Sequence, residues 1–405
     1  MHILVINSGS SSIKFSIFEA IEGDPNSLFE GEIGGIGNKP GLKFYDAAGH
    51  DFSAGLDAAK AETVAGAIGL IVEAVGRPGL PHIDAVGYRV VHPGARLHRH
   101  QLITEAVMKQ LEKAVEFAPL HDPAAIEVIR DVMSRYPDVE HYACFDTVFH
   151  QTMPEVATTY PIPPNFRDQG VRRYGFHGLS CESIVQQLKT ESLAAFPRRM
   201  IIAHLGSGCS VTAVMDGCSV DTTMGLTPTG GVVMGTRPGD LDPGLVLYLL
   251  RHMDGEQVAA LEKMLNHEAG MVALSGMPND MKAVREAAAK GNARAQLAVQ
   301  IFARSVKKAV GAFAAVLGQV DAVVFAGGIG EHDPQSRAEI LGGLEAFGVV
   351  LDSGLNHSKA SAARLVSVSH SATAVFVVPA KEDWMIARHV ERMSLASTRN
   401  TSSDQ

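Results

Sequence analysis

The sequence predicts an α/β protein that contains two copies of one folding unit. The segment MIIAHLGSGCSVTAVMDG at 200–217 aligns with residues 2–19 at an offset of 198 residues, which superimposes two loops rich in glycine and serine. This alignment places Ser210 on Ser12. A second pair, DAVGYRVVHPG at 84–94 and DAVVFAGGIGEH at 321–332, repeats a strand pattern that ends in glycine. Because predicted strands and helices alternate between these segments, we expect a duplicated α/β unit.

The elements of the first copy follow in order along the chain. Residues 2–18 predict two strands around the loop NSGSSSIK, which form a hairpin. Helical periodicity covers 61–76 and 105–117, and a buried strand is expected at 83–94, where Pro-Gly ends it. Further along, the sequence predicts a helix at 123–136, which a proline starts, and a strand at 141–150.

A proline-rich stretch, MPEVATTYPIPPNFRDQG, follows residue 150 and marks the expected domain boundary. The chain of 405 residues is long enough for two hydrophobic cores. We therefore expect an N-terminal domain at 1–150, completed by a C-terminal helix at 385–405, and a C-terminal, nucleotide-binding domain at 151–384.

Composition narrows the classes of partner. The formal net charge is −9 and Lys and Arg form no long cluster, so we expect no nucleic-acid or membrane partner. The four cysteines lack the spacing of a metal finger and are too few to stabilise such a chain with disulfides, which fits a reducing cytoplasm. The N-terminus does not resemble a signal peptide, and Gln319 and Asp321 interrupt the longest apolar run, 310–329. We expect a cytoplasmic protein.

A glycine-serine loop between two strands presents backbone N–H groups and hydroxyls at one place, which suits a phosphate. A single loop of this kind is more often a polar turn, but the second loop at 206–208 favours two loops that hold one polyphosphate. Lys14 lies on the same strand face as Ser12, where its ammonium could reach the phosphates. A solvated lysine on an edge strand remains the alternative.

Five motifs together resemble the acetate kinase family, which includes propionate kinases. They are IxVINSGSSSxK at the N-terminus, YGFHGLS at 174–180, HLGSGxS at 204–210, MGLTP with MGTRPGDLDPG within 224–244, and GGIGEH at 327–332. The resemblance runs from residue 3 to about residue 390. It implies two ribonuclease H-like domains of the type found in actin, sugar kinases and heat-shock chaperones, with the nucleotide in an interdomain cleft.

The resemblance also implies a reaction, in which a homodimer reversibly transfers the γ-phosphoryl group of ATP to acetate with Mg²⁺, giving acetyl phosphate and ADP. A carboxylate nucleophile is already ionised at neutral pH, so charge neutralisation matters more than a base. Arg89 and Arg237 match the two active-site arginines of the family, and a planar guanidinium suits carboxylate and phosphate oxygens. His177 matches the histidine that binds the transferring phosphoryl group. Asp146 matches an orienting aspartate, and His121 a further active-site histidine.

The remaining implied residues bind the substrates and the metal. Arg89 binds the substrate, and the small apolar acyl pocket consists of Val91, Leu120, Phe176 and Pro228, whose size leaves propionate as a secondary substrate. Mg²⁺, or Mn²⁺ in its place, is assigned to Asn7 and Glu382. The nucleotide is assigned to Ser10, Ser12, Lys14, His204, Leu205, Gly206, Ser207, Gly208, Asp280, Met281, Lys282, Gly328, Ile329, Gly330, Glu331 and His332. The other histidines, including His98 and His100, show no ligand pattern and are expected at the surface.

Several positions depart from the family pattern. Ser207 stands where the family usually has Asn, Lys282 where it has Arg, and Lys381 where it has Asn; HPG replaces HGG, HDP replaces HNP, and TPTGGVVMGTRPGD replaces TPLEGLMMGTRSGD. Because Ser207 lacks the amide donor, we expect a change in phosphate-donor affinity or preference. The alternatives are a propionate or butyrate kinase and, in another class, an ATP-binding switch like actin or a chaperone. A sugar kinase is less favoured, because its hydroxyl nucleophile needs a carboxylate base.

Overall fold

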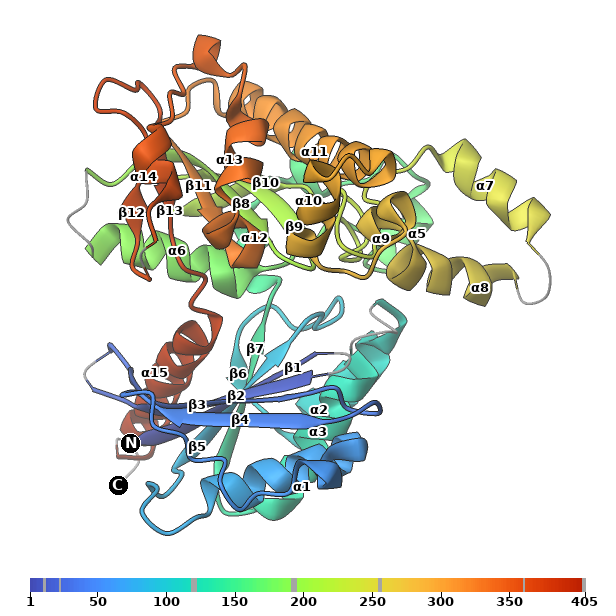
Figure 1. Cartoon of the computed structure of the whole chain (residues 1–405). Helices are drawn as coiled ribbons and strands as arrows, with labels where there is room; N and C mark the ends of the chain where they lie inside the picture. The colour runs from blue at the N-terminus through green and yellow to red at the C-terminus, as the bar shows by residue number, and fades with distance from the viewer. Residues whose placement is uncertain are drawn as a thin grey trace. The chain divides into compact units, whose positions relative to one another are not determined.

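The computed structural model describes residues 1–9, 12–21, 23–117, 122–190, 195–253, 257–359 and 361–402. The chain divides into two compact units, the first formed by Met1–Val148 with Lys381–Gln405 and the second by Phe149–Ala380. Figure 1 shows that each unit contains its own sheet. The division after Val148 lies two residues before the domain boundary expected from the sequence.

The first unit contains a seven-stranded sheet with the order β4-β3-β2-β1-β5-β7-β6. Strands β1 to β4 form an antiparallel meander, β5 and β7 continue the sheet parallel to β1, and β6 pairs antiparallel at the far edge. The bounds are β1 His2–Ser8, β2 Ser12–Glu19, β3 Asn26–Gly34, β4 Gly41–Asp46, β5 Ala85–Val90, β6 Gln101–Leu102 and β7 Glu140–Phe145.

Helices cover both faces of this sheet. Helices α1, α2 and α3 bury one apolar cluster with alternate residues of β1, such as Leu4 and Ile6. Helix α15 covers the other face, where a Cβ on Gly87 would lie only 2.7 Å from Ile386 and Val390, so glycine permits the close contact. The bounds are α1 Val64–Val75, α2 Glu105–Ala114, α3 Asp122–Arg135 and α15 Glu382–Ser402, with 3-10 turns at Ala58–Glu62 and Val115–Phe117.

The second unit has a six-stranded sheet with the order β10-β9-β8-β11-β13-β12. Helix α6 packs on it through an apolar cluster that includes Ile184 and Ile202, and Figure 1 shows α11 on the opposite side. The strands are β8 Arg199–Leu205, β9 Cys209–Met215, β10 Cys218–Thr222, β11 Ala322–Ala326, β12 Arg364–Leu365 and β13 Ala374–Val377.

The second unit contains most of the helices. They are α4 Glu155–Thr158, α5 Pro164–Asp168, α6 Gly178–Thr190, α7 Pro243–His252, α8 Gln257–Lys263, α9 Gly270–Ser275, α10 Met281–Ala289, α11 Ala293–Leu317, α12 Gly327–His332, α13 Pro334–Leu341 and α14 Ser353–His357. A π-helical turn at Met264–Glu268 and 3-10 turns at Val148–Thr152 and Glu345–Phe347 complete the set. Among the described residues, no helix is both long and apolar enough to span a bilayer.

The two sheets confirm the internal repeat. In each, a hairpin strand pairs in parallel with the strand of the second repeated segment, β1 with β5 and β8 with β11. Ile3 lies opposite Ala85 and Met200 opposite Ala322, so the two hairpin strands correspond at an offset of 197 residues, one less than the predicted 198. The aspartate that opens each DAV sequence has the same role. Asp84 Oδ2 accepts the backbone N–H of His2 at 2.7 Å, and Asp321 Oδ2 accepts that of Arg199 at 2.8 Å. The hairpin turns differ, because Ser8 pairs with Ile13 whereas Leu205 pairs with Cys209, which gives the second hairpin a tighter turn.

The predicted helices are present with small shifts of their ends, but the strand expected at 141–150 is shorter. β7 ends at Phe145 and a 3-10 turn begins at Val148. The apolar composition of this stretch does not distinguish a strand from a buried turn.

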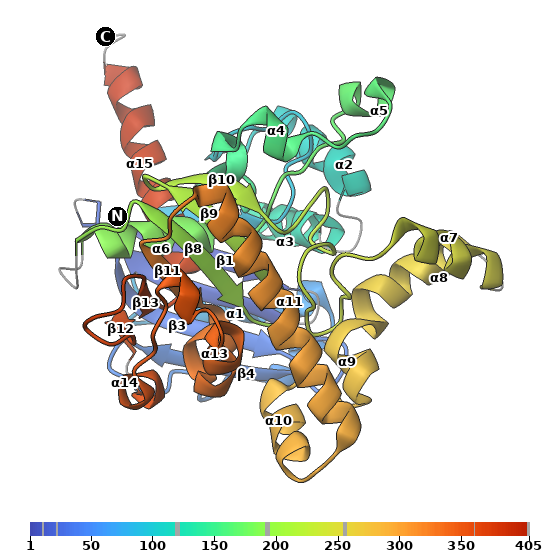
Figure 2. The ribbon, with the colours of Figure 1, turned by 90° about the horizontal axis from the view of Figure 1, so that it is seen from above.

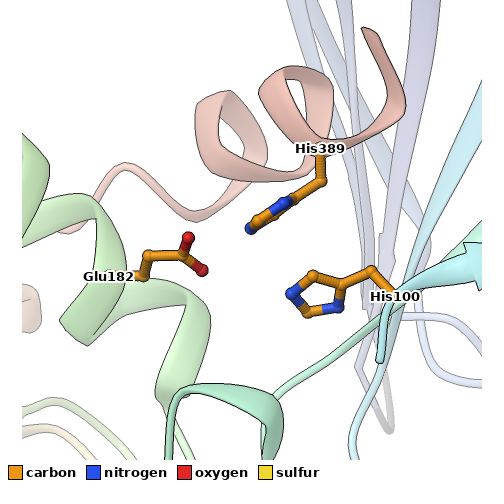
Figure 3. A group of neighbouring side chains, drawn as sticks. All are labelled: His100, Glu182 and His389. Carbon is orange, nitrogen blue, oxygen red and sulfur yellow. The ribbon is translucent and has the colours of Figure 1, made fainter. Parts of the chain in front are cut away.

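The prediction that the remaining histidines lie at the surface is correct for His50, His82, His98, His252, His267, His357 and His370, but it is wrong for three others. His92, His141 and His150 are buried. His100 is half-buried and its ring lies 4.1 Å from that of His389 (Figure 3). Burial, and then the charge of His389, lowers the pKa of His100 well below its usual value, so its ring is neutral and its Nδ1 accepts the backbone N–H of Phe145. The spacing of the histidines along the sequence does not show which distant groups bond their rings and so allow them to be buried.

His150 is expected to make folding sensitive to acid. Its ring bonds Ser219 Oγ and the carbonyl of Phe176, both at 2.9 Å, and burial lowers its pKa to about 4. The unfolded side chain has a pKa of about 6.5. Between these two pKa values the unfolded chain binds a proton that the folded chain does not. The contribution of His150 to the free energy of unfolding is therefore complete above about pH 6.5. It is lost as the pH falls toward 4, at up to about 1.4 kcal/mol per pH unit.

The test compares urea unfolding of the wild type and of His150→Gln at pH 7 and pH 5. The free energy of unfolding of the variant should fall less between the two pH values, although the variant is less stable at pH 7. His370→Gln, at an exposed histidine, should keep the pH dependence of the wild type. Equal pH dependence in wild type and His150→Gln would contradict the assignment.

Candidate functional site

In the first unit, an ion pair between a half-buried arginine and a buried aspartate forms where two neighbouring parallel strands end. Arg89 is near the end of β5 and Asp146 directly follows β7. Arg89 Nη2 lies 2.5 Å from Asp146 Oδ2, and Arg89 Nε lies 3.2 Å from Asp146 Oδ1, so the contact is bidentate. Burial would lower the pKa of Arg89, but the charges of Asp146 and Glu382 outweigh it and raise the pKa above its usual value. The arginine is therefore a fixed cation with a set orientation.

Asn7 connects this ion pair to two acids at the start of α15. Its Oδ1 accepts from Arg89 Nη1 at 3.3 Å, and its Nδ2 donates to Glu382 Oε2 at 3.4 Å and to Asp383 Oδ1 at 3.3 Å. Ser16 Oγ donates to Asp383 Oδ2 at 2.9 Å. Burial, and the charge of Glu382, raise the pKa of Asp383. The structure thus groups the predicted residues Asn7, Arg89, Asp146 and Glu382.

The sequence reading missed Asp383 and Ser16. The only sequence feature that could have indicated Asp383 is the pair of adjacent acids in KED at 381–383. Lys14 is exposed and pairs across the hairpin with Asn7, while the carbonyl of Ser12 accepts the N–H of Gly9 at 2.8 Å. Ser10, the remaining loop residue assigned to the nucleotide, is outside the described residues.

In the second unit, His177 has an unusual backbone conformation. Its φ is +58°, in the left-handed region that non-glycine residues rarely adopt, and such strain is concentrated at functional sites. Its Nδ1 is 3.0 Å from Ser210 Oγ, and its ring stacks on that of His204 at 4.2 Å between centroids. His204 is in turn held by Ser180 Oγ at 2.8 Å from Nδ1. These contacts fix the orientation of His177.

His177 and Arg237 converge on the backbone of the second glycine-serine loop. A Cβ on Gly208 would lie 3.3 Å from His177 Nε2 and 3.7 Å from Arg237 Nη1. The same Arg237 Nη1 donates to the carbonyl of Pro228 at 3.1 Å. An imidazole and a guanidinium therefore meet at the glycine-serine loop, and these two hydrogen-bond donors suit a phosphoryl group. Burial raises the pKa of the neighbouring Cys209 thiol to about 12, so it stays protonated.

The three segments predicted to bind the nucleotide meet in this unit. A Cβ on Gly206 would be 4.0 Å from the backbone nitrogen of Gly328, which places the loop 204–208 beside α12. The loop is also linked to the turn before α10, because Asn279 Nδ2 donates to Ser207 Oγ at 2.7 Å. The predicted residues of these segments are His204 to Gly208, Asp280 to Lys282 and Gly328 to His332.

Two of the predicted acidic residues hold the backbone of these segments. Asp280 Oδ1 caps α10 by accepting the N–H groups of Lys282 at 2.9 Å and of Ala283 at 3.3 Å. Glu331 Oε1 accepts the N–H groups of Gly327 at 3.0 Å and of Ala380 at 3.1 Å. Both carboxylates thus shape the loops.

Two arginines that the sequence reading did not single out brace the same segments. Arg285 of α10 binds Asp333 Oδ2 at 2.5 Å and Glu339 Oε2 at 2.9 Å, which connects α10 to the start of α13. Arg337 donates to the carbonyls of Gly330 at 2.7 Å and Asn356 at 2.5 Å. Burial, with the charge of Arg364, lowers the pKa of Arg337 to about 10.

The structure describes only some of the residues of the predicted acyl pocket. Val91 is half-buried in the first unit, and Phe176 and Pro228 are buried in the second. Leu120 and the predicted active-site residue His121 are outside the described residues.

The two sheets share the order of six strands, to which the first sheet adds β4 at one edge, and each contains a hairpin around a glycine-serine loop. This arrangement defines a duplicated α/β protein. The model of the acetokinase family matches residues 2–388. The chain therefore belongs to the acetokinase family, as the motifs predicted.

Relatives match over nearly their whole length. The chain is 40% identical to an acetate kinase of Geobacillus kaustophilus, over 97% of this chain and 99% of that protein. It is 42% identical to an acetate kinase of Nitrobacter hamburgensis, over 99% and 98% of the two chains.

Solved structures agree with this assignment. The acetate kinase of Porphyromonas gingivalis has a TM-score of 0.84 at 32% identity, and a propionate kinase of Francisella tularensis has a TM-score of 0.88 at 34% identity. Each alignment covers 97% of this chain and 99% of the other. The predicted fold class, a two-sheet α/β protein of this family, is confirmed.

Proposed function

We propose that this protein is an acetate kinase that reversibly transfers the γ-phosphoryl group of ATP to acetate, giving acetyl phosphate and ADP. The observation that carries the proposal is the convergence of His177 and Arg237 on Gly208, in a chain whose relatives are acetate kinases. In the reaction, a carboxylate oxygen of acetate forms a bond to the γ-phosphorus while the bond from that phosphorus to the β,γ-bridging oxygen breaks. ADP leaves with the electron pair.

The cationic side chains address the main difficulty, which is the approach of an anion to a polyanion. Acetate is ionised at neutral pH and needs no base. In the proposed mechanism Arg237 neutralises charge on the transferring group while His177 donates a hydrogen bond to it. Arg89, oriented by Asp146, binds acetate or the product at its carboxylate oxygens. Lys14 adds a cation for the nucleotide phosphates, and His121 a further polar contact.

The proposed metal site consists of Asn7 and Glu382. Mg²⁺ prefers oxygen ligands, and Glu382 supplies a carboxylate next to the amide of Asn7. The amide oxygen of Asn7 accepts from Arg89 in this structure, so binding of the ion requires the amide to turn its oxygen toward Glu382. When bound, Mg²⁺ would reduce the negative charge of the nucleotide phosphates. Mn²⁺ accepts the same ligands. The nucleotide itself is assigned to the three segments that meet around Ser207, and a cytoplasmic location stays a prediction.

The test is an assay with purified protein, ATP, Mg²⁺ and acetate, in which hydroxylamine traps the acyl phosphate as a hydroxamate. We expect hydroxamate that depends on both ATP and acetate. Comparing kcat/KM for acetate, propionate and butyrate decides which short-chain acid is preferred. The similarity to a propionate kinase supports propionate as the alternative substrate. ATP hydrolysis that proceeds without any acid, with no hydroxamate, would instead support the actin-like or chaperone-like switch.

The proposal includes a homodimer, which the surface of α7 supports. None of the ten residues of this fully described helix, PGLVLYLLRH, is buried. Leu247 and Tyr248 are 52% and 55% exposed, and both views show α7 and α8 at the margin of the second unit (Figures 1 and 2). An exposed apolar helix without charges before Arg251 can pack against the same helix of a second copy.

Leu247→Asp should therefore convert a dimer into a monomer, as measured by sedimentation velocity, because a carboxylate cannot be buried unpaired in an apolar interface. Val316→Asp is the matched control, at an equally exposed position on α11. It should remain dimeric. A wild-type protein that sediments as a monomer, or a dimer that Leu247→Asp leaves intact, would contradict this assignment of the interface.

A further inference from the structure

An amide lies on the glycine-serine loop at the place where the sequence indicated that one was lost. Ser207 replaces the usual asparagine of the family, yet its Oγ accepts a hydrogen bond from Asn279 Nδ2 at 2.7 Å. The two residues are separated by 72 positions, and the turn MPND brings the amide to the loop. The loop keeps its own closing bond, from Gly206 N–H to the carbonyl of Gly208 at 3.0 Å.

The position of this amide is specified from two sides. Asp280, the next residue, caps α10 and fixes the turn that carries Asn279. On the other side is Gly235, where a Cβ would lie only 2.1 Å from Asn279 Oδ1. The N–H of Gly235 also donates to the carbonyl of Ser207 at 3.0 Å. The side chain of Asn279 thus lies between Ser207 and Gly235, where any Cβ would displace the amide.

The amide retains hydrogen-bonding capacity. A primary amide has two N–H donors, and the bond to Ser207 needs one of them. Asn279 and Ser207 are both exposed. The next residue along the loop is Gly208, the point on which His177 and Arg237 converge. An anion bound on this loop would therefore meet the second N–H of Asn279.

We propose that Asn279 is a phosphate-binding residue of the donor site, with Ser207 as its positioning residue. One N–H of Asn279 bonds Ser207 and the other donates to an oxygen of the β- or γ-phosphate of ATP, or of the β-phosphate of ADP. The proposal rests on the proposed function, in which the nucleotide phosphates bind this loop. It predicts that the replacement of Asn by Ser at 207 does not remove the amide contact from the site.

The test is calorimetric titration of the full-length protein with ATP, ADP and AMP in the absence of acetate. Asn279→Ala should raise the Kd of ATP and ADP about tenfold to a hundredfold, the usual effect of losing a hydrogen bond to a charged group. AMP, which lacks the outer phosphates, should bind with unchanged Kd. Asn279→Asp should weaken ATP binding further, because a carboxylate repels phosphate. Adding Ser207→Asn to Asn279→Ala should restore part of the affinity.

The control variant is Asn292→Ala, which removes an exposed asparagine that caps α11. It should leave all three Kd values unchanged. If Asn279→Ala leaves the Kd of ATP within twofold, or weakens AMP as much as ATP, Asn279 only shapes the loop and the proposal is wrong. Its failure is distinct from that of the proposed function, because the wild type would still bind ATP and form hydroxamate. A wild type that binds no nucleotide would overturn both.

Discussion

Arg237→Ala is expected to lower kcat for acetyl phosphate formation by about 10³-fold, the usual loss when a group that stabilises transition-state charge is removed. The guanidinium is held by the carbonyl of Pro228 and faces Gly208 together with His177. Because Arg237 lies in a loop and is only half-buried, its truncation leaves the two cores intact. The hydroxamate assay measures kcat, and thermal unfolding followed by circular dichroism should show little change in Tm.

Two further variants sharpen this test. Arg237→Lys keeps the charge but loses the planar guanidinium, so its kcat should lie between those of the wild type and Arg237→Ala. Arg198→Ala removes an arginine whose ion pair with Asp216 is exposed, and it should change kcat by less than about twofold. If Arg237→Ala kept kcat within tenfold of the wild type, the proposed role of Arg237 would be excluded.

Asp146→Ala is expected to cost both stability and activity. Asp146 is 1% exposed and is the bidentate partner of Arg89, so its removal leaves a half-buried guanidinium without its main counter-charge. Breaking a buried pair in this way typically costs about 3–5 kcal/mol. Urea unfolding should show a loss of this size. The hydroxamate assay should show a large loss of kcat/KM for acetate, because Arg89 is no longer oriented.

The double variant Arg89→Met with Asp146→Ala separates the two effects. Replacing both charges by apolar side chains removes the unpaired cation, so most of the lost stability should return. Activity should not return, because Arg89 itself is absent. A double variant as unstable as Asp146→Ala would show that the destabilisation comes from lost packing or from Glu382, whose ion pair with Arg89 at 3.7 Å is also lost. Recovery of activity would show that the pair has no part in the reaction.

The sequence by itself determined the repeat, the family and the type of most elements predicted in the first copy, whereas the end of the strand expected at 141–150 is a 3-10 turn. The offset of the two glycine-serine loops predicted two hairpins, and the DAV segments predicted a further strand in each copy. The structure shows that each of these strands pairs in parallel with its hairpin. Even the aspartates that open these segments bond the hairpin strands alike. These features are readable because they depend on local pattern: strand alternation, glycine placement and motif spacing all lie within a few residues.

Only the tertiary structure decided which side chains share a site. Asn7 meets Asp383 across 376 positions, and Asn279 meets Ser207 across 72. His150, expected at the surface, is buried because Ser219 and Phe176 satisfy its ring. Hydrogen bonds between residues so far apart in sequence form only when the whole unit packs. A polar side chain is buried where such a distant partner completes its hydrogen bonds. The sequence therefore predicted the two glycine-serine loops, and the tertiary structure determined which side chains lie against them.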